Sequence, residues 1–264
     1  MKNKENNMKK SLVSMVMAGL VLAVGSGSAV AQDGPPRIVP VDIIPCSYNE
    51  GKGPADLASA IDAWNAYADK SPTNNAYSAW TMHKHYAGPD QDFDFAWLGA
   101  WKDGNAMGAG WGDYLANAGE VQAGFDAVAT CQAANNFGSV RHKAPSEGTP
   151  SDGVMVFSDC KLSEGVSSSM HAANMKRWVA VLDEAGIDAG IFHWYPIFGG
   201  GGESPFDYKS VTTFADYKAF GNMYQTMTNG GLYMKRNAIF GDSVSCDVGR
   251  VYNSKNHRYV ELRD

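Results

Sequence analysis

Residues 46–51 read CSYNEG, and residues 160–165 read CKLSEG, so a cysteine followed by Glu-Gly four and five residues later occurs twice. The two stretches lie 114 residues apart, and the same spacing separates Trp80 from Trp194. A near-constant offset across most of the chain is the pattern of a duplicated segment, and two copies of this length are too few for a solenoid. The sequence therefore predicts two similar domains packed together.

Each repeat predicts the element order β-α-β-β-α-β. Apolar, β-branched stretches at 39–46 and 153–160 favour strands, and residues 54–69 carry apolar side chains at helical spacing. Two more strand-like segments, a second helix and a weaker strand around the second cysteine complete each repeat. This order is the ferredoxin-like split βαβ arrangement, an antiparallel sheet with both helices on one face. Its bare face needs an apolar cover, which the other repeat can supply.

In this topology the chain from residue 38 onward resembles the dimeric α+β barrel superfamily, with two protomers fused in tandem. The predicted fold class is α+β, with ferredoxin-like units at 38–145 and 152–264 that form one pseudo-dimeric barrel, and we expect a monomer. The superfamily includes cofactor-free monooxygenases, small-ring isomerases, and haem-binding relatives of chlorite dismutase and peroxidase. No motif here selects one member family, so the resemblance carries over no catalytic residue.

The four cysteines occupy matching places, with Cys46 and Cys131 in the first repeat and Cys160 and Cys246 in the second. Four cysteines allow three pairings. Only one pairing keeps both bonds inside their own repeats and is the same in the two repeats. The leader pattern described below predicts export, and exported proteins meet an oxidising compartment in which disulfides form. We therefore predict two disulfides, one within each repeat. A metal site is disfavoured because the chain has no C-x-x-C pair.

The first 31 residues have the pattern of a cleaved signal peptide. Lysines precede an apolar run at 11–24, and Ala29-Val30-Ala31 forms an A-x-A cleavage signature. The run is 14 residues long, and a membrane span needs roughly 20. We expect a periplasmic or secreted protein with no membrane span after cleavage. The formal net charge of −6, without a basic run, argues against nucleic acid as a partner.

Three histidines are the candidate catalytic groups, because they break the repeat. His83 and His85 are two apart on a predicted strand, so both rings project from one face, as two metal ligands would. His193 lies on the matching strand of the second repeat and can serve as a general base or a haem ligand. The alternatives are a histidine packed in the core and two ordinary surface imidazoles. No third ligand is evident, so we predict no metal.

Aromatic residues are the candidate ligand-binding groups. Phe95 and Trp97 alternate along one face of the third strand in the first repeat, and Tyr208 lies on the matching face in the second. If this face lines the barrel, with Trp80 and Trp194 as further walls, the interior suits a small, largely apolar or aromatic ligand. An aromatic core without a cavity is the alternative.

The sequence thus predicts an exported barrel that binds a small apolar or aromatic molecule, and any reaction on that molecule would need no cofactor. The glycine-rich residues 104–112 lack the G-x-G-x-x-G order and a G-K-[ST] ending, so no nucleotide cofactor is expected. Two other functions stay open. One is a haem or metal protein that uses His193 or the pair His83 and His85, and the other is a structural or partner-binding protein.

Overall fold

The computed structural model describes residues 37–145, 152–200 and 204–262, so the predicted leader lies outside the described residues. The first repeat consists of β1 (Ile38–Tyr48), α1 (Pro54–Ala68), the 3-10 turn η1 (Asn74–Ala76), β2 (Tyr77–Tyr86), β3 (Phe95–Trp101), α2 (Gly104–Asn117), α3 (Gly119–Asp126), β4 (Ala129–Cys131) and β5 (Asn135–Lys143). The second consists of β6 (Gly153–Leu162), α4 (Ser168–Glu184), β7 (Gly190–Phe198), β8 (Tyr208–Phe214), α5 (Tyr217–Thr228), α6 (Leu232–Phe240), the turn η2 (Gly241–Ser243), β9 (Val244–Cys246) and β10 (Arg250–Arg258).

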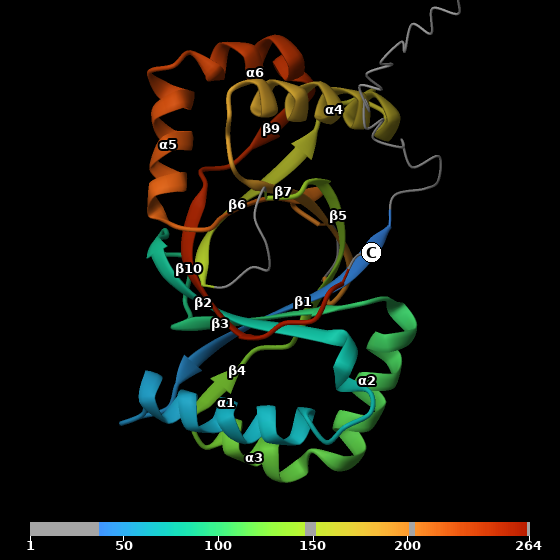
Figure 1. Ribbon diagram of the computed structural model, residues 1–264, viewed down its shortest axis with the longest axis vertical. Coiled ribbons are helices and arrows are strands. Elements are labelled where there is room, and N and C mark those ends of the chain that lie inside the picture. Colours follow the sequence, from blue (N-terminus) through green and yellow to red (C-terminus); the bar gives the residue numbers. More distant parts are fainter. Residues whose placement is uncertain (1–36, 146–151, 201–203, 263–264) are drawn as a thin grey trace, which may run out of the picture. The chain divides into compact units, whose positions relative to one another are not determined.

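Eight of these strands close into an antiparallel barrel, which Figure 1 shows end-on. The first repeat contributes the order β5-β1-β3-β2 and the second the order β10-β6-β8-β7. Two seams join the repeats, β5 with β7 and β10 with β2. Each of the eight described strands therefore has a partner on both sides. Helices α1–α3 and α4–α6 lie outside the barrel on opposite sides (Figure 1), which confirms the predicted fold class.

The closing strand of each repeat differs from the sequence prediction, which placed it around the second cysteine. That cysteine ends a strand of only three residues, β4 or β9. The long closing strands β5 and β10 begin four residues later, at Asn135 and Arg250. The single second helix that was expected is also divided in two in each repeat. Gly231 is one reason, because its φ of 73° turns the chain from α5 into α6.

Both predicted disulfides are present. Cys46 bonds to Cys131, and Cys160 bonds to Cys246. Each pair occupies directly opposite positions where β1 meets β4 and where β6 meets β9. Each bridge therefore ties the first strand of its repeat to the segment that leads into the last strand. The CSYNEG and CKLSEG stretches begin at these two bridges.

Matched aspartates explain other parts of the repeat. Asp103 and Asp216 begin α2 and α5, and each accepts a hydrogen bond of 2.8 Å from the backbone N–H three residues on. Asp94 accepts the N–H of Tyr48 at 2.8 Å, and Asp207 accepts that of Leu162 at 2.6 Å. The same side chain thus holds the same turn or helix end in each repeat.

Each strand of the barrel has two covered faces. Along β3, Ala96, Leu98 and Ala100 face the interior cluster, whereas the aromatic residues pack beneath the helices; they are Phe95, Trp97 and Trp101. Helix α2 lies so close to the sheet that a Cβ on Gly110 would collide with the ring of Trp101. The aromatic face of β3 therefore belongs to the helix–sheet layer and not to the barrel interior.

Candidate ligand-binding site

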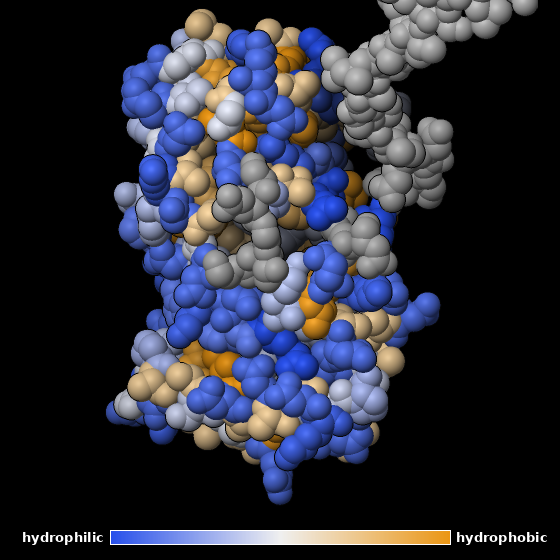
Figure 2. Space-filling view, viewed as in Figure 1, coloured by the Kyte–Doolittle hydropathy of each residue, from blue (hydrophilic) through white to orange (hydrophobic). Residues whose placement is uncertain are grey.

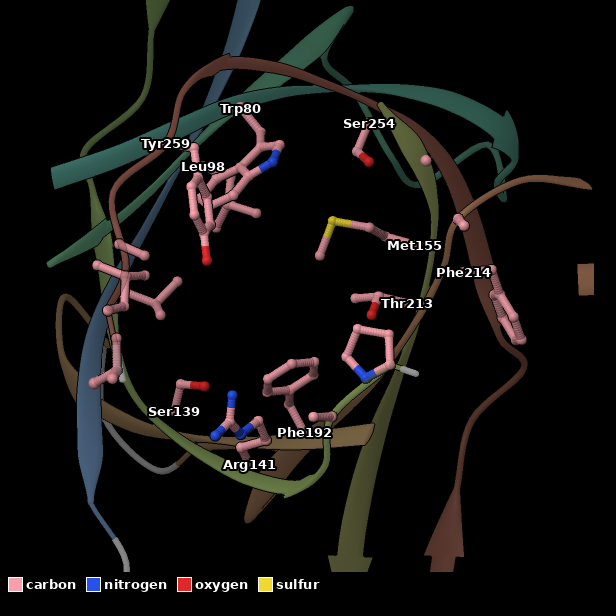
Figure 3. A pocket seen from close by; sticks show the side chains of 18 of the residues that line it. Trp80, Leu98, Ser139, Arg141, Met155, Phe192, Thr213, Phe214, Ser254 and Tyr259 are labelled. Carbon is pink, nitrogen blue, oxygen red and sulfur yellow. The ribbon is translucent and has the colours of Figure 1, made fainter. Parts of the chain in front are cut away.

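A cavity of about 710 Å³ lies inside the barrel towards one end (Figure 3). All eight barrel strands contribute to its wall. Residues that flank β5, β6, β8 and β10 complete it. The apolar part of the wall comprises Val39, Val41, Trp80, Leu98, Ala100, Ala144, Pro145, Val154, Met155, Phe192, Trp194, Phe214, Ala215 and Leu262. Ligand sites typically have volumes of about 300–1,000 Å³ and mainly apolar walls. The cavity therefore has the size and lining of a site for a small molecule.

A few polar side chains interrupt this wall. Ser139 and Arg141 come from β5, and Figure 3 shows both pointing into the interior. Two acidic side chains also line the cavity, one just before β6 and one after β10, and both already accept hydrogen bonds. Asp152 accepts the backbone N–H of Asn256 at 2.9 Å, and Glu261 accepts the hydroxyl of Tyr259 at 2.9 Å. The polar groups are thus few, which is how an apolar site fixes the orientation of a ligand.

A smaller cavity of about 270 Å³ lies at the other end of the barrel. Its aromatic wall residues are Phe93, Phe137, Phe157, Phe206 and Tyr252. The charged groups there are paired, because Asp159 lies 2.6 Å from Lys209 and 3.4 Å from Arg250. Burial lowers the pKa of Lys209, while the ion pair with Asp159 opposes that shift.

Packed rings separate the two cavities. The Trp194 ring centroid lies 6.3 Å from that of Phe137 and 5.3 Å from that of Phe157. Trp194 lines the larger cavity, and the two phenylalanines line the smaller one. All three belong to one buried cluster. These packed rings therefore lie between the two pockets.

The aromatic candidates of the sequence are divided between the two faces of the sheet. Trp80 and Trp194 line the larger cavity. Phe95, Trp97 and Tyr208 lie outside the barrel interior, under the helices. Phe95 packs on Tyr48 at 5.0 Å between centroids, Trp97 donates to the Tyr77 hydroxyl at 2.8 Å, and Tyr208 packs on His171 of α4 at 5.0 Å. The ring-lined face of the third strand thus faces the helices.

His193 lies on the outer face of β7 beneath α4, and only 2 % of it is exposed. It belongs to a cluster of three histidines with His142 of β5 and His171 of α4. The His193 ring centroid is 4.3 Å from that of His142 and 5.1 Å from that of His171. Burial lowers the pKa of His193 well below its ordinary value and that of His142 to about 4, and the nearby imidazoles add to both shifts. The three rings are therefore neutral at pH 7.

His83 and His85 lie near the end of β2 and line neither cavity. His83 is partly buried, with its ring centroid 6.1 Å from that of Phe95, and burial lowers its pKa. His85 is exposed, 4.9 Å from Tyr217 of α5 by ring centroids. Within the described part of the chain, no group of three or more His, Cys, Asp or Glu side chains is arranged to hold a metal ion.

Sequence reasoning missed the lining residues Ser139, Arg141, Met155 and Phe192. A signal for two of them was present, because Phe137, Ser139 and Arg141 alternate with small or β-branched neighbours as one face of a strand would. It was overlooked because the closing strand was expected at Cys131 and not after it.

No family model matches the sequence, and no curated protein matches it significantly. Among solved structures, a proposed monooxygenase from Lactobacillus acidophilus NCFM superposes with a TM-score of 0.51 at 12% identity, covering 84% of this chain and 95% of that one. A proposed monooxygenase from Fusobacterium nucleatum subsp. nucleatum ATCC 25586 gives 0.52 at 9% identity, over 84% and 93%. An arginine-to-lysine variant of chlorite dismutase from Candidatus Nitrospira defluvii gives 0.50 at 6% identity, over 82% and 91%. At these identities the likeness shows the fold alone: the chain has the fold of the dimeric α+β barrel superfamily, with two protomer-like repeats fused in tandem.

Proposed function

We propose that the larger cavity binds a small, largely apolar or aromatic molecule. The observation that carries this proposal is the cavity of about 710 Å³ with its mainly apolar wall. Protein interiors are close-packed and contain few voids larger than a water molecule. A ligand in this space would gain the contacts that the apolar wall otherwise lacks.

Trp194 supports the same proposal. Its indole N–H is buried and has no hydrogen-bond partner among the described residues. Buried donors are almost always paired, since an unpaired one loses its interaction with water without compensation. The indole nitrogen is not accessible from the cavity, so Trp194 supports the proposal through the apolar contact that its ring offers a ligand.

The candidate reaction is oxygenation or isomerisation without a cofactor. The fold is shared with two proteins named as proposed monooxygenases, and that likeness alone suggests which reactions to assay first. His193, His83 and His85 do not line the cavity, so a reaction in the cavity would not use them. The haem and metal alternatives would have to use those histidines outside the barrel.

We also propose that residues 1–31 direct export. Two disulfides suit an oxidising compartment, and this agrees with the leader pattern of the sequence. Across the described ranges, no helix has the length and apolar character needed to cross a membrane. The surface seen in Figure 2 is largely hydrophilic, with apolar residues in small groups.

The test is a calorimetric screen of small aromatic compounds against the purified protein and two cavity-filling variants. Ala100 and Ala96 lie on the inner face of β3, and Ala100 lines the larger cavity whereas Ala96 lines the smaller. Ala100→Phe should abolish binding, because its ring occupies the proposed site. Ala96→Phe is the matched control and should bind as the wild type does.

Two results would contradict the proposal. Loss of binding in Ala96→Phe alone would move the site to the smaller cavity. If the wild-type protein bound no compound of the screen, the alternative of a structural or partner-binding protein would be favoured. Circular dichroism of both variants checks that each retains the native fold.

A further inference from the structure

We infer that the molecule bound in the larger cavity is a monoanion, an aromatic or alicyclic carboxylate whose carboxylate pairs with Arg141. The inference rests on the proposed function and adds the chemical class of the ligand. Three observations carry it: the place of Arg141 on the cavity wall, its lack of a partner, and the aromatic side chains beside it.

Arg141 occupies a position where strand geometry aims its side chain into the barrel. Phe137, Ser139 and Arg141 alternate along β5, and all three line one of the two cavities. In the seam with β7, Arg141 lies opposite Phe192 and Ser139 lies opposite Trp194. A guanidinium and a hydroxyl on one strand thus stand beside two aromatic rings on the next, as Figure 3 shows for Arg141, Ser139 and Phe192.

The guanidinium of Arg141 is exposed and has no counter-charge among the described residues. In the described ranges it makes no hydrogen bond or ion pair. Other arginines of the barrel do: Arg250 pairs with Asp247 at 3.1 Å, and Arg258 pairs with Asp69 at 2.7 Å. The two acids of the same cavity wall are engaged elsewhere, by a backbone N–H and a tyrosine hydroxyl. The cavity therefore offers one cation without a partner among the described residues.

A carboxylate is the group that fits this cation. The planar guanidinium can bind both oxygens of a carboxylate at once, and such charge-assisted pairs are stronger than neutral hydrogen bonds. The Arg141 side chain is exposed, so solvent reaches the pair, and the apolar wall contributes by contact with the body of the ligand. Phe192 and Trp194 are placed to contact the ring that bears the carboxylate.

The cavity wall limits the ligand to one negative charge. Among the described lining residues, Arg141 is the one cation. A dicarboxylate would bring a second charge that loses its hydration without gaining a cationic partner. The cavity is thus complementary to an apolar body with a single anionic end.

The experiment measures binding by titration calorimetry with the purified protein. The probes are 2-naphthoate and anthracene-2-carboxylate, their primary amides, and a naphthalene dicarboxylate. In the wild type, each monocarboxylate should bind roughly two- to fivefold more tightly than its amide, the range expected for an ion pair with an exposed guanidinium. The dicarboxylate should bind more weakly than the monocarboxylate.

Three variants assign the preference to one side chain. Arg141→Gln should bind carboxylate and amide alike, whereas Arg141→Lys should keep part of the difference because it keeps the charge. Arg177→Gln is the control, since Arg177 is exposed on α4 and lines neither cavity. It should behave as the wild type.

The outcomes separate this inference from the proposed function. If the wild type binds amides as tightly as carboxylates, the inference fails and the apolar site stands. If Arg141→Gln retains the carboxylate preference, another group recognises the anion and the inference also fails. If no probe binds, both fall together.

Discussion

His142, His171 and His193 form a buried cluster that must stay neutral for the fold to pack. His171 Nε2 lies 3.4 Å from His193 Nδ1, so at least one of these nitrogens must carry no proton for the two to hydrogen-bond. Tyr208 and Tyr195 pack against the same rings, with centroids 4.2 Å and 6.3 Å from His193. No carboxylate contributes to the pKa shifts of the three histidines, so protonation of any ring places an uncompensated charge in the core.

We predict that the protein loses stability as pH falls from about 6.5 to about 4. Each histidine has a lower pKa in the folded protein than in the unfolded chain, so within this window the unfolded chain binds more protons. Each can steepen the slope of the unfolding free energy by up to about 1.4 kcal/mol per pH unit. Urea unfolding at a series of pH values measures the slope.

The variant His142→Phe tests the cause. It removes the ring whose pKa falls to about 4 and whose buried Nε2 has no partner in the described structure. We expect a shallower slope below pH 6.5 and little change above pH 7. A profile parallel to that of the wild type would contradict the assignment to this cluster.

Individual site residues could be predicted only in part, and β3 shows the physical reason. Alternation separates Phe95 and Trp97 from Ala96 and Leu98, but it does not say which set faces the barrel. In an open sheet with one solvent-exposed face, the polar set of residues would identify the exposed face. Here both faces are apolar, because helices cover one and the opposite barrel wall covers the other. The bulkier set faces the helices.

At the scale of elements, each disulfide should stabilise its own repeat. We predict that the double variant Cys46→Ala with Cys131→Ala loses roughly 2–5 kcal/mol of unfolding free energy, as is usual for native disulfides of small exported domains. The matched double variant Cys160→Ala with Cys246→Ala should lose a similar amount, because its bridge closes a loop of 86 residues against 85.

Amide hydrogen exchange distinguishes local from global effects of these variants. Exchange should rise first in β4 and α3 when the first bridge is removed, and in β9 and α6 when the second is removed. An equal rise throughout both repeats in either variant would show that the bridges do not act separately.

The main order of strands and helices was predictable because the two repeats carry the same pattern of apolar residues. A weak strand or helix pattern in one repeat was supported by the matching pattern in the other. The cysteine pairing followed from the same duplication. The closing strands were misplaced because β4 and β9 are three-residue strands that end at the second cysteine. The strands beyond them carry polar and charged residues, such as Arg141 and Lys255, that conceal their alternation.

At the scale of the molecule, we predict a monomer. The two seams between repeats already pair every described barrel strand on both sides, so no exposed barrel edge is available for a second chain. Size-exclusion chromatography with light scattering should give a single-chain mass over a wide concentration range. A stable dimer would show that the helical layers, not the strands, provide an interface.

The seam between β2 and β10 also governs when the barrel can close. Ala79 near the start of β2 pairs with Arg258 at the end of β10, so 179 residues of chain separate these partners. This edge of β2 stays unpaired until β10 has been synthesised. Pairing between segments so distant in sequence is intrinsically slow. Ring closure is therefore the late step of folding, and the waiting edge is where aggregation of the nascent chain would begin.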